Sequence, residues 1–590
     1  MEKPRITIDG YPRPQFVRDG WMNLNGIWDF EFDDADTGEK EGWFRQGGFT
    51  RKINVPFVFE SQASLIGDTS RHDNVWYRRT FTLTGEYADK RVVLNFQGVD
   101  YIAKVWVNGE YVGSHKGAYA KFSFDITNAV HEGENIIVLK AEDSYSCLQP
   151  RGKQKWADNK YLCWYTQSTG IWKTVWLEFT NQAHVEGVKM TPYIDDVAVE
   201  FEYDVRRGSS KELTLKTEIT FGGEKVRDFT VSVGGGPLKY RADIYCDALT
   251  YKCMLWSPKA PNLYDVKFTL FDGGKPVDEV RSYFGMRKIS VSDGRVWLNN
   301  SELYQKLILE QGYWADTLLT PPGDDAIIKD IDLTLKMGFN GMRIHQKIED
   351  DRFLYECDRR GMLTYAEMPS AYEFADDMQD EFTREWIDVV RQQNNHPCII
   401  AWVPFNESWG LPTIRSDKKQ QDFTEAMYYL TKSLDGTRPV ITNDGWEHTI
   451  SDMLTIHDYE QYADKLASRY ADRDAVVSGR TQSSSCKKLF ADGFSDAGQP
   501  LLISEFGGIA FDGDKGWGYG DHASNKEEFI KRFTDVVCAI KDNPSVMGYC
   551  YTQLTDVQQE VNGLLTIDRQ PKIPLEKIAE ANSTTGFKVS

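Results

Sequence analysis

The sequence lacks paired cysteines, excess positive charge and long hydrophobic runs. Nine cysteines are scattered from Cys147 to Cys550 without a Cys-x-x-Cys pair, which predicts neither a disulfide framework nor a zinc site and fits a reducing compartment. The net charge of −20 argues against nucleic acid and anionic membranes as partners. Residues 1–10 contain no hydrophobic signal region, and no apolar run is long enough to span a membrane, so we expect a cytoplasmic protein.

Aromatic residues are plentiful, with 17 Trp, 29 Tyr and 31 Phe. Most of them are expected to fill a large core, because aromatic side chains bury much apolar area. Some could contact the apolar faces of sugar rings.

Residues 1–180 are predicted to form a jelly-roll β-sandwich, and residues 181–287 a smaller immunoglobulin-like sandwich. In the first region, Ile102–Val107 and Glu110–Val112 flank Asn108-Gly109, a strong two-residue hairpin signal because both residues tolerate positive φ. In the second region, polar and apolar residues alternate from Leu213 to Phe221, which indicates a half-buried antiparallel strand.

Helical and strand patterns alternate in residues 288–590, which predicts a (β/α)8 barrel. Helices are expected at Asp324–Met337, Asp351–Arg359, Glu381–Gln393 and Lys526–Lys541. The eight expected strands are Tyr304–Glu310, Gly341–His345, Met362–Glu367, Cys398–Phe405, Pro439–Asp444, Met453–Asp458, Pro500–Glu505 and Val546–Gln553. A doubly wound open sheet is the alternative, because alternation alone does not prove closure. The connections 460–498 and 507–525 are long, which favours functional or disordered loops.

Polar side chains gather where these strands end, the position of active sites in barrels of this kind. Asn406-Glu407 ends the fourth strand and Glu505 the seventh, each after an apolar run. Two carboxylates about 5–5.5 Å apart equip a retaining glycosidase, one as nucleophile and the other as acid/base. The structural alternative is that one or both simply pair with a cation such as Arg343.

Several motifs make the resemblance to a family specific. Asn406-Glu407-Ser408-Trp409-Gly410 and Ser504-Glu505-Phe506-Gly507-Gly508 resemble the two signatures of glycoside hydrolase family 2, which includes β-galactosidases, β-glucuronidases and β-mannosidases. Further similar motifs cover nearly the whole chain in order: Trp21-Met22-Asn23-Leu24-Asn25-Gly26-Ile27-Trp28, Trp106-Val107-Asn108-Gly109, Leu255-Trp256-Ser257-Pro258 and Gly338-Phe339-Asn340-Gly341-Met342-Arg343.

The resemblance implies a retaining exo-β-glycosidase acting on a glycoside or oligosaccharide, with Glu407 as acid/base and Glu505 as nucleophile. Asn406 would bind the sugar 2-OH, Arg343 would orient Glu505, and Tyr459 would lie near the nucleophile. The other candidate sugar contacts are His345, His457, Glu367, Trp446, Gln553 and Tyr551, the last at a position where the family often has Trp.

Departures from the family pattern bear on cofactors and substrate. The Glu-x-His element that helps some β-galactosidases bind magnesium is not evident after Glu367, so we expect no metal and no cofactor. Asn562 is followed by Gly563-Leu564, without the lysine of β-glucuronidases, which makes β-galactoside the default substrate. β-Uronidase and arabinosidase-like activities stay open, because the basic loop 151–155 could reach the site and pair with a sugar carboxylate.

Two further hypotheses use the same scaffold. A carbohydrate-binding protein without catalysis would not need both Glu407 and Glu505. A transglycosylase would pass the same glycosyl intermediate to a sugar rather than to water. The resemblance also suggests a homo-oligomer, although no residue demonstrates an interface.

Overall fold

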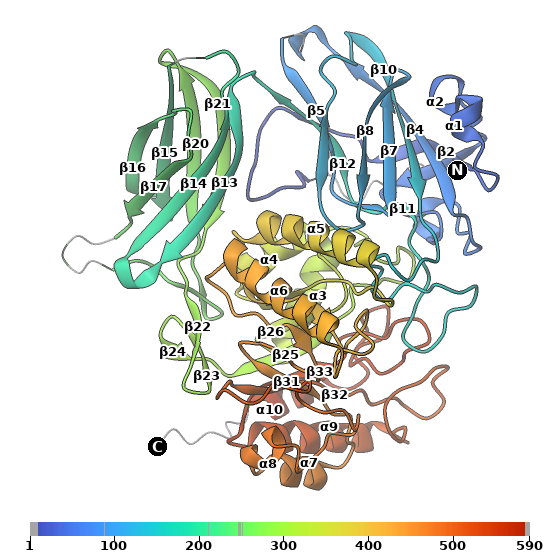
Figure 1. Ribbon diagram of the computed structural model, residues 1–590, viewed down its shortest axis with the longest axis vertical. Helices are drawn as coiled ribbons and strands as arrows, with labels where there is room; N and C mark the ends of the chain where they lie inside the picture. The colour runs from blue at the N-terminus through green and yellow to red at the C-terminus, as the bar shows by residue number, and fades with distance from the viewer. Residues whose placement is uncertain (1–9, 88, 211, 246–248, 250–251, 584–590) are drawn as a thin grey trace.

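The computed structural model describes residues 10–583 except 88, 211, 246–248, 250 and 251. In Figure 1 two β domains lie side by side above a larger domain of helices and parallel strands. The outer limits of the predicted regions 1–180 and 288–590 fall outside the described residues, as does the stretch 1–9 in which a signal region was sought.

The first domain packs two antiparallel sheets against each other. Their strand orders are β1-β12-β5-β9 and β3-β2-β4-β10-β7-β8. The bounds are β1 Trp21–Asn23, β2 Gly26–Phe32, β3 Arg51–Val55, β4 Asn74–Leu83, β5 Arg91–Phe96, β6 Val99–Asp100, β7 Ile102–Val107, β8 Glu110–Lys116, β9 Phe122–Asp125, β10 Gly133–Glu142, β11 Gly170–Ile171 and β12 Val175–Thr180. Asn108 and Gly109 have φ of 51° and 80°, which confirms the predicted hairpin. Two short helices, α1 (Gly38–Glu41) and α2 (Trp43–Gln46), were not predicted.

The second domain is the smaller sandwich. Its sheets have the orders β13-β14-β17 and β16-β15-β20-β21. The bounds are β13 His184–Tyr193, β14 Ala198–Arg206, β15 Leu213–Phe221, β16 Glu224–Ser232, β17 Leu238–Asp243, β18 Trp256–Ser257, β19 Ala260–Pro261, β20 Tyr264–Asp272 and β21 Lys275–Phe284. Buried and half-buried residues alternate along β15 as predicted, because one face packs on the core and the other meets water. A small sheet of β22 (Ile289–Ser292), β23 (Arg295–Leu298) and β24 (Ser301–Glu302) leads into the third domain.

The third domain closes a parallel sheet into a barrel. The strands are β25 Gln305–Glu310, β26 Gly341–Ile344, β27 Leu363–Glu367, β28 Ile399–Val403 with β29 Phe405–Asn406, β30 Asn443–Asp444, β31 Leu454–His457, β32 Leu501–Gly507 and β33 Val546–Thr552. The sheet order is β28-β27-β26-β25-β33-β32-β31, while β30 pairs with β29. The first strand therefore lies beside the last, while β30 pairs with β29 and contacts β31 at the far end of the sheet, so the barrel prediction is confirmed.

Helices alternate with these strands. Their bounds are α3 Asp324–Lys336, α4 Asp351–Arg360, α5 Asp376–Gln393, α6 Lys418–Leu434, α7 Ala463–Tyr470, α8 Arg473–Val477, α9 Lys526–Lys541 and α10 Leu575–Ser583. Helix α9 has the predicted bounds, and Asn525 caps its first turn by accepting from Glu528 N. Such a cap satisfies a backbone donor that has no partner within the helix.

Three local predictions were wrong. Helix α5 begins at Asp376 rather than Glu381, because acidic residues suit a helix's first turn. The fifth strand is only β30, with a single bridge from Trp402 to Val440 before it. Residues 460–498 are not an irregular loop throughout, since α7 lies there, buries Leu466 and Tyr470 one turn apart and contacts α9.

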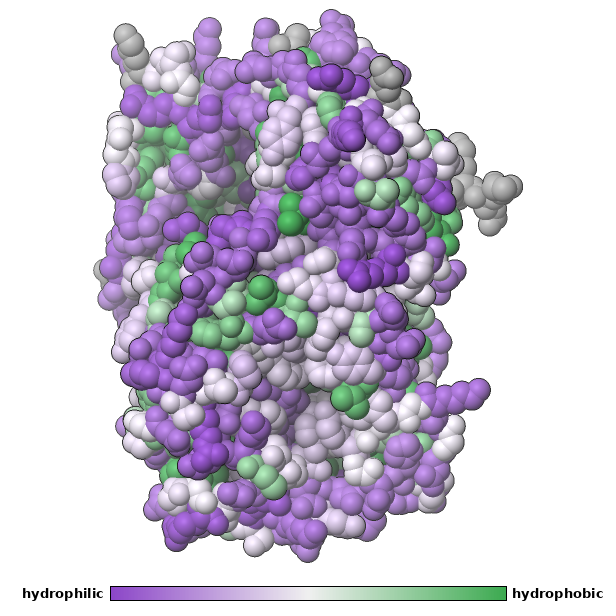
Figure 2. All heavy atoms as spheres, turned by 45° about the vertical axis from the view of Figure 1, so that its right-hand side comes forward, coloured by the Kyte–Doolittle hydropathy of each residue, from purple (hydrophilic) through white to green (hydrophobic). Residues whose placement is uncertain are grey.

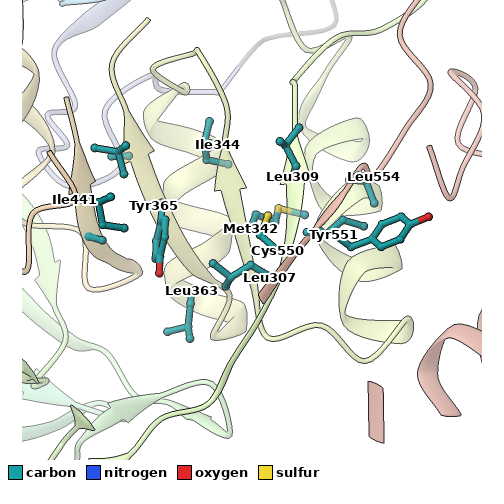
Figure 3. Close-up of a cluster of buried hydrophobic side chains, with 14 of the residues drawn as sticks. Leu307, Leu309, Met342, Ile344, Leu363, Tyr365, Ile441, Cys550, Tyr551 and Leu554 are labelled. Carbon is teal, nitrogen blue, oxygen red and sulfur yellow. The ribbon is translucent and has the colours of Figure 1, made fainter. Parts of the chain in front are cut away.

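Hydrophobic side chains from neighbouring strands fill the barrel. Leu307, Met342 and Leu363 lie together in Figure 3, each with at most 1% of its surface exposed. On the face shown in Figure 2, hydrophilic residues predominate and hydrophobic ones form small separate groups, an ordinary surface that indicates no particular partner. Among the described helices, none combines the length and apolar character needed to cross a membrane.

Candidate active site

Arg343 is the centre of the charged group at the carboxyl ends of the barrel strands. Arg343 is the last residue but one of β26 and has 0% exposure. Its guanidinium nitrogens lie 2.7 Å from carboxylate oxygens of Glu367 and Glu505 and 2.9 Å from one of Asp444. Its Nη2 also donates to Asn406 Oδ1 at 2.6 Å. One buried cation thus orients groups from four other strands.

Glu407 and Glu505 meet across this group through His457. The Nδ1 atom of His457 lies 2.7 Å from Glu407 Oε1 and 3.5 Å from Glu505 Oε2. One oxygen of each glutamate and this nitrogen all lie within 4.8 Å of one another. The two carboxylates that the sequence singled out are therefore side by side, with one oxygen of each at most 4.8 Å from the other.

The backbone at Glu407 turns sharply so that its side chain faces the barrel axis. Glu407 and Ser408 have φ of 54° and 59°, a region that side-chain-bearing residues rarely adopt. The turn is held by Glu407 N donating to Asp444 O at 2.9 Å and Ser408 N donating to Asn443 Oδ1 at 3.0 Å. Such conformations cluster at functional sites, where the surrounding structure maintains them.

The charges around Glu505 favour its ionised form. Burial would raise the pKa of Glu505, but His457, Arg343 and His345 outweigh it, and the pKa is lowered. Burial disfavours the charged form of His457, yet Glu505, Asp444 and Glu407 raise its pKa to about 10. Glu407, His457 and Glu505 also have the donor types that bind metals.

Tyr459 contacts the Glu505 carboxylate directly. Its hydroxyl donates to Glu505 Oε2 at 2.5 Å and lies 3.1 Å from Thr552 Oγ1. The Tyr459 ring stacks on Tyr519 with ring centres 3.4 Å apart. Tyr519 belongs to the connection 507–525, so part of that connection is built against the site.

Of the other predicted site residues, some contact the group around Glu505 and His457 and others do not. His345 Nδ1 lies 3.0 Å from Glu367 Oε1 and 4.0 Å from Glu505 Oε1. The Trp446 ring packs edge-on against His457, with centres 5.4 Å apart. Tyr551 is not brought to the site: its ring packs 5.0 Å from that of Phe533 on α9 and points away from the barrel interior in Figure 3.

Gln553 belongs to a buried amide and carboxyl network. Its Nε2 donates to Asn562 Oδ1 at 2.6 Å, and Asn562 Nδ2 donates to Glu560 Oε1 at 3.1 Å. The other Glu560 oxygen accepts from the Tyr165 hydroxyl, which belongs to the first domain. The network therefore joins the barrel to a segment nearly 400 residues earlier.

The basic loop 151–155 also reaches the barrel, and its three basic residues face different ways. Arg151 donates to the carbonyls of Ser144 and Lys155, and Lys155 Nζ donates to Asp158 O at 2.6 Å. The Nζ atom of Lys153 lies 5.2 Å from the centre of the Trp409 ring, two residues after Glu407, and the charges of Glu505 and Glu407 act on it.

Asp444, Glu560, Tyr165 and Tyr519 are neighbours of the site that were not among the predicted site residues. Asp444 ends the fifth predicted strand, so the sequence placed it at the same rim, although without a role. Tyr519 lies in the long connection 507–525, while nothing in the sequence marks Glu560 and Tyr165, because a tertiary contact between distant segments brings them together.

Comparison with known proteins bears on this geometry. Residues 21–180 match the model described as "Glycosyl hydrolases family 2, sugar binding domain", residues 183–287 match "Glycosyl hydrolases family 2", and residues 289–585 match "Glycosyl hydrolases family 2, TIM barrel domain". The chain belongs to glycosyl hydrolase family 2.

Relatives within family 2 carry different substrate names. A β-galactosidase of Leuconostoc mesenteroides subsp. mesenteroides is 25% identical over 93% of this chain and 54% of its own length. A Ruminococcus gnavus β-glucuronidase structure has a TM-score of 0.79 at 18% identity, covering 97% of this chain and 99% of the other. An Eisenbergiella tayi β-galacturonidase structure has a TM-score of 0.75 at 20% identity, covering 97% and 98%. These structures share the three-domain family 2 fold.

The chain spans about half the length of the first curated relatives it matches, 48% and 54% for two β-galactosidases. Family 2 membership therefore establishes the architecture, while the substrate depends on the site itself.

Proposed function

We propose that the protein is a retaining exo-β-glycosidase with Glu505 as nucleophile and Glu407 as acid/base. The observation that carries the proposal is the pair of carboxylates, from opposite sides of the barrel, with one oxygen of each within 4.8 Å. Family 2 relatives named β-galactosidase and structures named β-glucuronidase and β-galacturonidase support a glycosidic substrate.

The proposed reaction proceeds by two displacements. The ionised Glu505 attacks the anomeric carbon while the bond to the leaving oxygen breaks, and Glu407 gives that oxygen its proton. Glu407 then takes a proton from water, the resulting hydroxide attacks the same carbon, and Glu505 leaves. Two inversions restore the β configuration.

Neighbouring groups fit this division of work. Arg343, His457 and Tyr459 hold Glu505 in its ionised form, as a nucleophile requires. Asn406 Nδ2 is buried without a hydrogen-bond partner among the described residues, so it is free to donate to a sugar hydroxyl. We assign it to the 2-OH, a contact that strengthens in the transition state.

β-Galactoside is the proposed default glycone. Asn562 stands in the buried network with Gln553 and Glu560, where a glucuronidase-type element would supply a lysine for the sugar carboxylate. A β-uronide is the second candidate, and the observation that favours it is the buried ammonium of Lys153 over the Trp409 ring, two residues after Glu407.

The test is hydrolysis of a panel of p-nitrophenyl glycosides by the wild type and Glu505→Gln in parallel. The panel contains the β-galactoside, β-glucoside, β-glucuronide, β-galacturonide, β-mannoside and α-L-arabinosides. We expect the β-galactoside to be cleaved, and activity in Glu505→Gln to fall by on the order of 10⁴-fold or more.

Full activity in a folded Glu505→Gln variant would remove the nucleophile assignment. Cleavage of only a uronide would replace the glycone assignment and keep the mechanism. A wild type inactive on the whole panel but able to bind monosaccharides would favour the carbohydrate-binding hypothesis.

A further inference from the structure

The first domain sends one segment into the barrel rim. In Figure 1 the teal segment descends from the sandwich toward the barrel. The backbone N–H groups of Arg151 and Gly152 donate to Ser370 O at 3.0 and 3.1 Å, and the Tyr372 hydroxyl donates to Gly152 O at 2.6 Å. A Cβ on Gly152 would lie 2.4 Å from Gln346 O. The close approach requires glycine here, so the segment is fixed on the barrel rather than loosely draped.

Lys153 follows Gly152 in the chain, and both its backbone and its side chain make contacts. Its carbonyl accepts from Tyr165 N at 2.7 Å, and its ammonium lies 5.2 Å from the centre of the Trp409 ring, two residues after Glu407. Lys153 is 7% exposed. Among the described residues, no carboxylate oxygen lies within 4.0 Å of its Nζ. A buried ammonium without an ion-pair partner has donor capacity left for a ligand.

The electric field of the site keeps this ammonium charged. Burial would lower the pKa of Lys153, but Cys163, Glu560, Glu505 and Glu407 outweigh burial and raise it. Lys153 therefore stays a donor at every pH at which the enzyme would work.

Glu560 is a buried carboxyl group whose charge acts on Lys153. Its two oxygens accept from Asn562 Nδ2 at 3.1 Å and from the Tyr165 hydroxyl, and Tyr165 is the residue whose backbone pairs with Lys153. Each carboxylate oxygen has a second lone-pair direction. The first domain thus brings a donor, Lys153, and the barrel brings an acceptor, Glu560, and Tyr165 contacts both residues.

We infer that Lys153 and Glu560 form an interdomain hydroxyl-binding pair that selects a neutral glycone; this rests on the proposed glycosidase function. A hydroxyl both donates and accepts, so it matches the pair. A sugar carboxylate accepts only, so it would bind Lys153 but could donate nothing to Glu560 and would be repelled by the ionised Glu505. Lys153 is on this account a specificity-determining residue supplied to the barrel by the first domain.

Calorimetric binding of monosaccharides tests the pair without depending on turnover. The ligands are D-galactose, D-glucose, D-mannose, L-arabinose and D-galacturonate, and the proteins are the wild type, Lys153→Met and Lys153→Gln. Lys155→Met is the matched control on the same loop, because among the described residues the Lys155 Nζ donates only to the Asp158 carbonyl. Melting temperatures confirm that each variant is folded.

We expect one neutral sugar to bind the wild type at least about 10-fold tighter than galacturonate. Both Lys153 variants should bind that sugar about 10- to 100-fold more weakly, which corresponds to the loss of one charged hydrogen bond. They should also raise KM for its aryl glycoside more than they lower kcat. Lys155→Met should match the wild type.

Unchanged affinity in folded Lys153→Met would overturn the inference. So would tighter binding of galacturonate than of every neutral sugar, lost in the Lys153 variants, or no binding of any neutral sugar. Neutral-sugar binding that depends on Lys153, without hydrolysis of any glycoside, would refute the glycosidase proposal and leave the pair standing.

Discussion

Two buried clusters of titratable groups lie at opposite ends of the same barrel. At the carboxyl end, Glu407, His457 and Glu505 converge after their strands; at the other end, Asp358, His396 and Cys398 converge before β27 and β28. Both clusters bring donor atoms within 4.8 Å of one another. Proximity of acidic and basic groups therefore does not distinguish them.

The difference lies in how completely the groups are satisfied. Asp358 Oδ2 accepts from Tyr283 at 2.8 Å and lies 2.6 Å from His396 Nδ1, and Oδ1 accepts from Cys398 N at 2.9 Å. Asp358 is 0% exposed. This cluster fastens the second domain, through Tyr283, to the barrel.

At the carboxyl end the Glu407 side chain is 19% exposed, and buried donors of Asn406 and Trp446 lack partners among the described residues. Buried polar atoms are normally paired, so unpaired ones call for a ligand or water. Unpaired hydrogen-bonding groups, rather than clustered charge, therefore distinguish the Glu407 cluster from the Asp358 cluster.

The largest expected effect is on catalysis and concerns the cluster of Glu407, His457 and Glu505. Glu407→Ala should slow glycosides with poor leaving groups by about 10²- to 10⁴-fold, since their oxygen then departs without a proton, while activated aryl glycosides slow much less. Azide should partly restore turnover and give a β-glycosyl azide, measured by product analysis. Equal slowing of both substrate types would count against the acid/base role.

The next effect is on the stability of the protein and concerns the cluster of Asp358, His396 and Cys398. Asp358→Asn should cost about 2–4 kcal/mol of unfolding free energy, because one oxygen acceptor is replaced by a donor facing buried donors. Denaturant unfolding measures the loss, and kcat per folded molecule should stay near that of the wild type. A large fall in kcat with unchanged stability would contradict the structural role of the Asp358 cluster.

A smaller effect concerns pH. His457→Gln removes the cation that contributes most to lowering the pKa of Glu505, so the acid limb of kcat/KM should move up by about one pH unit. An acid limb that stays in place would show that His457 does not tune the nucleophile.

Stability should respond to the same change at alkaline pH. A group whose pKa is raised on folding, here to about 10, contributes stability that is complete below its ordinary pKa and is lost as pH rises through the folded value. The wild type should therefore lose unfolding free energy between about pH 7 and 10, and His457→Gln should lose less. Parallel curves for the two proteins would contradict the assignment.

Much of the fold could be predicted because the local sequence pattern matches the burial that each element has in the tertiary structure. Helix α9 has both a capping Asn525 and an amphipathic face, and burial alternates along β15 from Leu213 to Thr220. Glu407 and Glu505 were predictable because a carboxylate directly after a buried strand is costly without a function or a partner.

The rest depends on contacts that no local pattern encodes. Glu560 reaches the site by contacting Tyr165 across the domain boundary, and Lys153 was one of three basic residues whose directions the sequence did not distinguish. Tyr551 was assigned to the site by analogy in position, whereas its strand register turns it toward Phe533.

The most direct measurement traps the covalent intermediate. A 2-deoxy-2-fluoro-β-galactoside with an activated leaving group would be incubated with the wild type and with Glu505→Gln, then digested and analysed by peptide mass spectrometry. The account predicts a glycosyl adduct on Glu505, absent from the variant. An adduct on Glu407 instead, or turnover with inversion at the anomeric carbon and no adduct, would contradict it.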